Sequence, residues 1–210
     1  WLSVVVDLPS ANQVVPLPNL EFKFVCANSL ISLDQGLQGT LDSKFSHNLK
    51  GDLINIRDKY FESSNKTEKE KHQKKYQVLT HPSLFAETKR DQQLKSYKPF
   101  NINASSEFYD PELMHGVQEF DVVIGNPPYV STKGVDTEMK EKLEEAYGFA
   151  DDLYSHFYFK GLELCKEQGV LSYITSKTFW TIQTKKNVRE LLLKNNFIDI
   201  YDTANPFDSV

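Results

Sequence analysis

FDVVIGNPPYV, residues 120–130, is the most informative stretch of this sequence. A short apolar segment from Phe120 to Ile124 leads into Gly125 and then into an Asn-Pro-Pro-Tyr turn. A short apolar run bounded by turn residues is typical of a buried strand in a parallel sheet. Open α/β sheets bind their ligands at the carboxyl ends of such strands. We therefore expect the turn at residues 126–129 to form part of a functional site.

The residue types in this turn suit one kind of chemistry. Asn126 offers a side-chain carbonyl, and Pro127 offers a backbone carbonyl in a preset geometry, because two consecutive prolines fix φ and lack N–H groups. Tyr129 offers an aromatic face on which a base extruded from a duplex can stack. Acceptors around an exocyclic amine stabilise the positive charge that develops as its nitrogen attacks a methyl sulfonium. The alternative interpretation is an ordinary Asn-Pro-Pro turn followed by a loop tyrosine.

Length and composition place the chain among globular proteins. It has 210 residues, of which 40% are hydrophobic and 25% charged, enough for one full core. No apolar run approaches the length of a membrane span, and we expect a cytoplasmic protein without a signal peptide. The net charge of −5 is unfavourable for binding phosphates, so we expect DNA contacts to lie mainly outside this chain.

Metal-binding patterns are not evident in the sequence. The two cysteines, Cys26 and Cys165, lie far apart and show neither metal-ligand nor redox spacing. The five histidines are scattered along the chain without ligand spacing. We therefore expect no metal site.

The hydrophobic patterns predict alternating strands and helices. Besides the run at 120–124, strands are predicted at residues 19–26, 170–175 and 197–201. Helices are predicted at 137–147, closed by Gly148, from Asp151 to just before Gly169, and at 184–194. This order is typical of an α/β protein with a parallel sheet wrapped by helices.

Residues of about 41–98 differ in composition from the rest and predict a helical, charged insertion. Apolar residues between Leu53 and Phe61 indicate a helix with one buried stripe. A dense mixed-charge run from Lys66 to Lys75 follows, which favours a solvated helical face over a phosphate-binding surface. We expect the insertion to pack on the main sheet or on a neighbouring domain.

Two further asparagines follow apolar segments. Asn28 stands at the carboxyl end of the strand predicted at 19–26, where it is either a ligand-binding residue or a solvated turn residue. Asn205, in the run Asn205-Pro206-Phe207, lacks a preceding strand of the same kind, a second proline and a tyrosine. We therefore do not interpret that run as a second acceptor turn.

Four stretches together resemble the amino-methyltransferases of bacterial restriction–modification systems, in particular the large type IIG enzymes that join a nuclease to an adenine-N6 DNA methyltransferase. They lie within residues 17–30, 108–129, 152–157 and 169–176, and they include Phe108-Tyr109-Asp110-Pro111 ahead of the turn and Leu-Tyr-x-x-Phe after it. The resemblance implies a Rossmann-like class I methyltransferase sheet, S-adenosylmethionine as the cofactor and double-stranded DNA with a flipped adenine as the partner.

The resemblance also implies roles for single residues. The catalytic turn would comprise Asn126, Pro127, Pro128 and Tyr129, with Tyr129 and Phe207 stacking on the flipped base. Asn28 and Phe157 would contact the methyl donor.

Some features of that family have no counterpart here. The glycine-rich donor loop and the acidic residue that binds the donor ribose are absent, as are a nuclease motif and a target-recognition domain. We therefore expect a methyltransferase domain that spans 1–210, truncated at its N-terminal side, whose missing parts belong to the rest of a parent polypeptide. We expect the chain alone to bind S-adenosylmethionine weakly or not at all and to be inactive.

Other functions remain open on the sequence alone. A similar acceptor turn serves enzymes that methylate glutamine in proteins or adenine in RNA. A non-catalytic DNA-binding or assembly subunit that retains the fold is the alternative from a different class.

Overall fold

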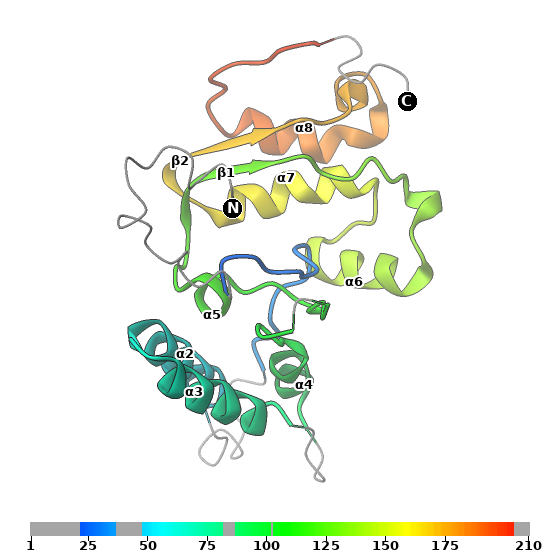
Figure 1. Cartoon of the computed structure of the whole chain (residues 1–210). Coiled ribbons are helices and arrows are strands. Elements are labelled where there is room, and N and C mark those ends of the chain that lie inside the picture. Colours follow the sequence, from blue (N-terminus) through cyan, green and yellow to red (C-terminus); the bar gives the residue numbers. More distant parts are fainter. Residues whose placement is uncertain (1–21, 37–47, 82–86, 102, 204–210) are drawn as a thin grey trace, which may run out of the picture. The chain divides into compact units, whose positions relative to one another are not determined.

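The computed structural model describes residues 22–36, 48–81, 87–101 and 103–203, and Figure 1 labels its helices and strands. The chain divides into two compact units. The first comprises residues up to 27, 34–107 and 113–115, and the second comprises 28–33, 108–112 and the residues from 116 onward. The charged segment predicted as an insertion lies within the first unit, and the turn at residues 126–129 lies within the second.

Helices make up most of the first unit. They are α2 (Leu49–Glu62), α3 (Lys66–Leu79) and α4 (Lys89–Ser96), and the division between the units passes through α5 (Pro111–His115). A side chain caps the start of each of the first three: Asn48, Asn65 and Thr88 accept hydrogen bonds from backbone N–H groups of the first turn. The helices predicted for the apolar stripe and for the mixed-charge run are therefore confirmed.

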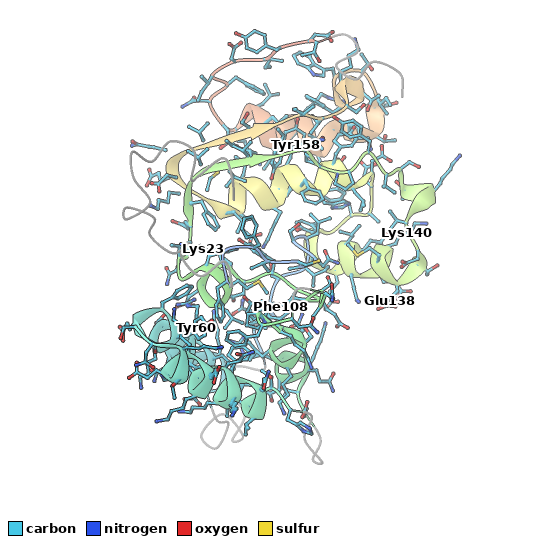
Figure 2. The ribbon with its side chains drawn as sticks, viewed as in Figure 1. Lys23, Tyr60, Phe108, Glu138, Lys140 and Tyr158 are labelled. Atoms are coloured by element: carbon cyan, nitrogen blue, oxygen red, sulfur yellow. The ribbon has the colours of Figure 1, made fainter. Side chains whose placement is uncertain are left out.

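An aromatic cluster forms the core of this unit. Phe100 packs its edge against the ring of Phe22 at 5.4 Å between centroids, and Tyr60, labelled in Figure 2, lies 5.1 Å from Phe100. Tyr76 is the buried residue of α3, whose other described side chains are partly or fully exposed. The charged residues of α3 therefore form a solvated face, as predicted.

A parallel strand pair is the centre of the second unit. Strand β1 (Phe120–Gly125) pairs with β2 (Cys165–Tyr173), and Gly125 lies opposite Tyr173 at the carboxyl end. The connection between them contains η3 (Thr132–Gly134), α6 (Thr137–Tyr147) and α7 (Leu153–Leu164), and β2 leads to η4 (Lys177–Trp180), η5 (Gln183–Lys185) and α8 (Lys186–Leu193). Figure 1 shows α7 running alongside the strands.

One face of the strand pair is covered and the other is open. Leu171 and Tyr173 of β2 pack against Tyr154, Tyr158 and Val188 from α7 and α8. On the opposite face, Val122 and Ile124 are 53% and 78% exposed. The expectation of a fully buried strand at 120–124 is therefore wrong, because only one face of β1 is covered by the residues that the structure describes.

Several predicted boundaries need correction. Helix α7 ends at Leu164, and Gly169 lies inside β2 rather than after the helix, because the chain turns directly from α7 into the strand. Strand β2 begins at Cys165, five residues before the predicted start. The predicted helices at 137–147 and 184–194 are confirmed, the first closed by Gly148 in a left-handed conformation at φ 77°.

Two predicted strands are not formed in the described part of the chain. Residues 22–24 form a turn with Phe22 at φ 63°, and only an isolated parallel bridge joins Ala27 to Ser106. Residues 197–201 have no regular structure and are exposed. An alternating pattern becomes a strand only where a neighbouring backbone accepts and donates its hydrogen bonds, and these segments lack such a neighbour among the residues described. The architecture is thus mixed α/β with a two-stranded parallel sheet, and the larger Rossmann-like sheet stays a prediction.

No helix among the described residues is both long enough and apolar enough to span a bilayer.

Candidate active site

The Asn-Pro-Pro-Tyr turn starts directly at the carboxyl end of β1. The carbonyl of Gly125 accepts a hydrogen bond from Ile174 N at 3.2 Å, so the strand pairing continues to the first residue of the turn. Pro127 is buried, whereas Asn126 and Pro128 are exposed and Tyr129 is 49% exposed. The buried proline fixes the turn to the protein, and the amide of Asn126 and the ring of Tyr129 are accessible to a ligand.

The start of α7 holds the chain where it leaves the turn. Leu153 N donates to the carbonyl of Val130 at 3.0 Å, and Thr132 N donates to Asp152 Oδ1 at 3.0 Å. Asp152 occupies the N-cap position of α7, yet its side chain makes no capping hydrogen bond to that helix. The predicted acidic residue at the helix start is therefore present, but it anchors the loop after the turn instead of the helix.

A buried lysine supports this anchor. Lys185 is only 3% exposed, and its Nζ donates to Asp151 and, at 2.7 Å, to Asp152 Oδ2. Burial opposes the charge on Lys185, but the hydrogen bonds to both carboxylates outweigh it and raise its pKa above the ordinary value. Burial likewise opposes the charge on Asp152, and hydrogen bonds from Lys185 and Thr132 outweigh it and lower the pKa of that carboxyl. Lys185 and Asp152 are therefore charged at neutral pH.

These charged groups line a hollow of about 420 Å³ beside the loop. Its wall includes Thr132 after the turn, Phe149 before α7, and Thr184 and Lys185 of η5. Polar and apolar side chains thus line a space that opens next to the exit of the turn.

Two tyrosines of α7 hold the loop at the carboxyl end of β2. The hydroxyl of Tyr158 lies 2.6 Å from Thr175 Oγ1, and that of Tyr154 lies 2.9 Å from Thr178 Oγ1. Figure 2 labels Tyr158 on the side of α7 that faces the strands. Burial raises the pKa of Tyr158 against the hydrogen bond with Thr175, and the neighbouring hydroxyls of Tyr154 and Tyr129 raise it further. Helix α7 therefore links the loops that follow both strands.

Asn28 is held by α6. Its Oδ1 accepts from Leu30 N at 3.2 Å, and its Nδ2 contacts the sulfur of Met139 at 3.7 Å. The predicted position at the end of a strand is wrong, since residues 22–26 form no strand and Asn28 stabilises a local turn instead. An asparagine often makes such a bond to the backbone two residues ahead.

The segment that carries Asn28 has two further fixed points. Tyr147 of α6 donates its hydroxyl to the carbonyl of Leu30 at 2.8 Å, and Lys160 of α7 donates to Ser32 Oγ at 2.8 Å. The segment is therefore ordered by both helices that flank the loop after the turn.

The structure thus brings together some predicted site residues and not others. Asn126, Pro127, Pro128 and Tyr129 form one turn beside α7, and Phe157 lies half-buried on that helix. The side chain of Asn28 contacts Leu30 N and Met139 of α6. Phe207 lies outside the described residues.

Few patterns in the sequence indicate the residues that support the turn. Lys185 stands in a run of polar residues that resembles a solvated helix start, although the adjacent carboxylates Asp151 and Asp152 indicate the need for a cation. In the described residues, no group of three or more histidine, cysteine or acidic side chains is placed to hold a metal ion.

Comparisons with known proteins cover most of the chain. The family model of the Eco57I restriction-modification methylases matches residues 13–208. The Type II methyltransferase M.BstVI of Geobacillus stearothermophilus is 34% identical over 98 residues, which are 43% of this chain and 17% of that protein. The Type II restriction enzyme and methyltransferase RM.Eco57I of Escherichia coli is 32% identical over 87 residues, which are 38% of this chain and 9% of that protein.

A third relative is less similar in sequence. The Adenine-specific methyltransferase BrxX of Escherichia coli O9:H4 (strain HS) is 28% identical over 79 residues, 37% of this chain and 7% of that protein. The chain thus spans less than a fifth of the length of each of these three relatives. No solved structure gives a significant match. Since the family model matches nearly the whole chain, this protein belongs to the Eco57I restriction-modification methylase family.

Proposed function

We propose that this chain is the part of a DNA methyltransferase that holds the target base, and that the reaction transfers a methyl group from S-adenosylmethionine to N6 of a flipped adenine. One observation carries the proposal. The acceptor turn leaves the end of a parallel strand with Pro127 buried, while the side chains of Asn126 and Tyr129 are accessible. Membership of the family and the names of the relatives support DNA as the substrate.

The residues of the turn would act on the amine of the adenine. The Asn126 side-chain carbonyl and the Pro127 backbone carbonyl accept the two N6 hydrogens, which directs the nitrogen lone pair away from the ring. As the N6–CH₃ bond forms, the same acceptors stabilise the positive charge on nitrogen until one proton is lost to solvent. Tyr129 stacks on the flipped ring and replaces part of the stacking lost from the duplex.

The residues proposed for the methyl donor fit it chemically. Asn28 has two amide hydrogens, and the sulfur of Met139 engages only one of them, so the other can donate to the adenine ring of the donor. Phe157 offers a half-buried aromatic side chain. When bound, S-adenosylmethionine supplies the methyl group and its sulfur retains the electron pair of the broken bond.

The larger organisation follows from the same proposal. The chain would be a partial methyltransferase domain over 1–210 with a helical insertion at about 41–98, within a cytoplasmic restriction–modification protein. The rest of that polypeptide would supply the glycine-rich donor loop and target recognition, and it would carry a nuclease if the organisation follows RM.Eco57I, whose name includes both activities.

Methylation by the protein expressed from its complete gene tests this function. Unmethylated DNA and S-adenosylmethionine are incubated with the protein, and digested nucleosides are analysed by mass spectrometry for N6-methyladenine. Asn126→Ala removes an acceptor and should lower the rate by about 100-fold or more. Asn195→Ala is the matched control, because Asn195 is an exposed asparagine at the end of α8 that binds only Leu191 O.

The outcome separates the candidate functions. N6-methyladenine that is lost in Asn126→Ala and retained in Asn195→Ala supports the proposal. A folded protein that methylates RNA or a protein glutamine instead, or that methylates no substrate while still binding DNA, would exclude it in favour of one of the alternatives.

A further inference from the structure

The carboxylate of Asp152 connects α7 to the loop after the turn. Its Oδ1 accepts from Thr132 N at 3.0 Å and from Thr132 Oγ1 at 3.4 Å, and its Oδ2 accepts from Lys185 Nζ at 2.7 Å. An aspartate at this position of a helix ordinarily accepts from the N–H groups of the first helical turn. Here the carboxylate makes no capping hydrogen bond, and it accepts hydrogen bonds from the loop instead.

Lys185 fixes the orientation of this carboxylate. The ammonium is buried, it pairs with Asp151 and Asp152, and it lies 5.3 Å from the centre of the Tyr154 ring. A buried charge is stable only while its partners stay in place. The lysine and both carboxylates therefore form a rigid unit that joins the starts of α7 and α8.

This unit lies close to the catalytic turn along the chain. Thr132 follows Tyr129 by three residues, and between them Val130 O accepts from Leu153 N at 3.0 Å. The exit of the turn is thus fixed at two successive points by the first residues of α7. A displacement of about 1 Å in catalytic groups can lower a rate by about 100-fold.

We propose that Asp152, held by Lys185, is a positioning residue for the Asn126–Tyr129 turn: its carboxylate anchors Thr132 and so keeps the acceptors and the tyrosine ring where the target base must be held. The inference rests on the proposed function, since it assigns a second role within the same site. Asp152 does not touch the base, so its loss should lower kcat and leave the KM for DNA within about 3-fold, because the side chain acts through the backbone of the loop.

Two substitutions at Asp152 test the anchor. Asp152→Ala removes the acceptor of Thr132 and should lower kcat by about 10- to 100-fold. Asp152→Asn keeps one oxygen, for which the donors Thr132 N and Lys185 Nζ compete, so its kcat should lie between those of Asp152→Ala and the wild type. Asp121→Ala is the matched control, because Asp121 pairs with Lys166 at 2.9 Å at the opposite end of β1.

Exchange of amide hydrogens provides a readout that does not depend on the substrate. Peptides covering residues 126–134 should exchange about 10-fold faster in Asp152→Ala, and at the wild-type rate in Asp121→Ala. If Asp152→Ala does not fold, Asp152→Glu keeps the charge for Lys185 but moves the acceptor by one methylene, and it should still lower kcat.

The two proposals fail in different ways. A wild-type protein that methylates no DNA defeats the proposed function, and the exchange of the loop still tests the anchor. Wild-type methylation with unchanged kcat and unchanged exchange in Asp152→Ala would overturn the positioning role alone. A lower kcat in Asp152→Ala with unchanged exchange of the loop would also overturn it, since the side chain would then not act through the loop.

Discussion

Gly161 of α7 lies directly against the ring of Tyr173 in β2, so closely that a β-carbon at residue 161 would meet the tyrosine hydroxyl. The same β-carbon would lie 2.7 Å from Leu171 Cδ1. Helix and strand approach one another here because the glycine has no side chain. This contact, between the helix that supports the turn and the strand beside it, sets how closely α7 covers the sheet.

Gly161→Ala should therefore destabilise the second unit. Alanine favours the helix by about 1 kcal/mol, but overpacking against Tyr173 and Leu171 costs about 1–3 kcal/mol, so a net loss of about 1 kcal/mol is expected. Denaturant unfolding measures the change, and Tyr173→Phe in the same chain should recover part of it. A variant as stable as the wild type would show that the helix can move away from the strand at no cost.

His156 should make the stability of the second unit sensitive to acid. Its Nε2 accepts from Asp151 N at 3.0 Å, its ring stacks on Phe149 at 4.5 Å, and burial lowers its pKa from 6.5 to about 4, against the nearby carboxylate of Asp151. Between pH 6.5 and 4 the unfolded chain therefore binds a proton that the folded chain excludes, so the free energy of unfolding falls as the pH falls through this range.

Denaturant unfolding at pH 7 and pH 5 measures this dependence. In His156→Phe the ring contact with Phe149 is retained while the titrating nitrogen is removed, so the decrease between the two pH values should be smaller than in the wild type. Equal decreases in the two proteins would assign the acid sensitivity to other groups.

Substitutions at Tyr129 should separate stacking from the other functions of the turn. Tyr129→Phe keeps the ring and should leave kcat/KM for DNA methylation within about 3-fold, whereas Tyr129→Ala should lower it by about 5- to 150-fold, since stacking on one base contributes about 1–3 kcal/mol. Tyr201→Ala is a suitable control, because Tyr201 is an exposed tyrosine without regular structure around it. Equal losses for Phe and Ala would assign the role to the hydroxyl.

Asn65 is exposed, yet its side chain should contribute to the stability of the first unit. Its side chain accepts from Glu68 N at 2.9 Å and caps α3, a helix with one buried residue. Asn65→Ala should cost about 1 kcal/mol, and exchange of the first amides of α3 should accelerate. Lys71→Ala on the exposed side of α3 should change stability by less than about 0.5 kcal/mol. Equal behaviour of the two variants would contradict the capping role.

The elements that sequence predicted correctly have local causes. Helix α6 follows from its acidic start at Asp136 and from Gly148, and β1 follows from a compact apolar run that ends in glycine and proline. The turn at residues 126–129 can be recognised because its residues are consecutive, and the family expected from it is confirmed by the family match. Such features depend on residues that are near one another along the chain.

The remaining features depend on contacts that no local pattern encodes. The apolar run at 197–201 predicted a strand, but a strand also needs a partner. Lys185 is 33 residues from Asp152, and its burial results from the packing of α8 against α7. Asp152 does not cap α7 for the same reason, because Thr132 and Lys185 donate to its carboxylate.

The open face of β1 has a consequence for the behaviour of the chain in solution. Val122 and Ile124 present adjacent apolar side chains to water on a strand that, in the described part of the protein, is paired along one edge only. Exposed apolar strands of this kind associate with one another as protein concentration rises. The colloidal stability of this chain should therefore be limited by one face of a single strand, and a lysine at residue 122 or 124 should raise its solubility without disturbing the packing of α7.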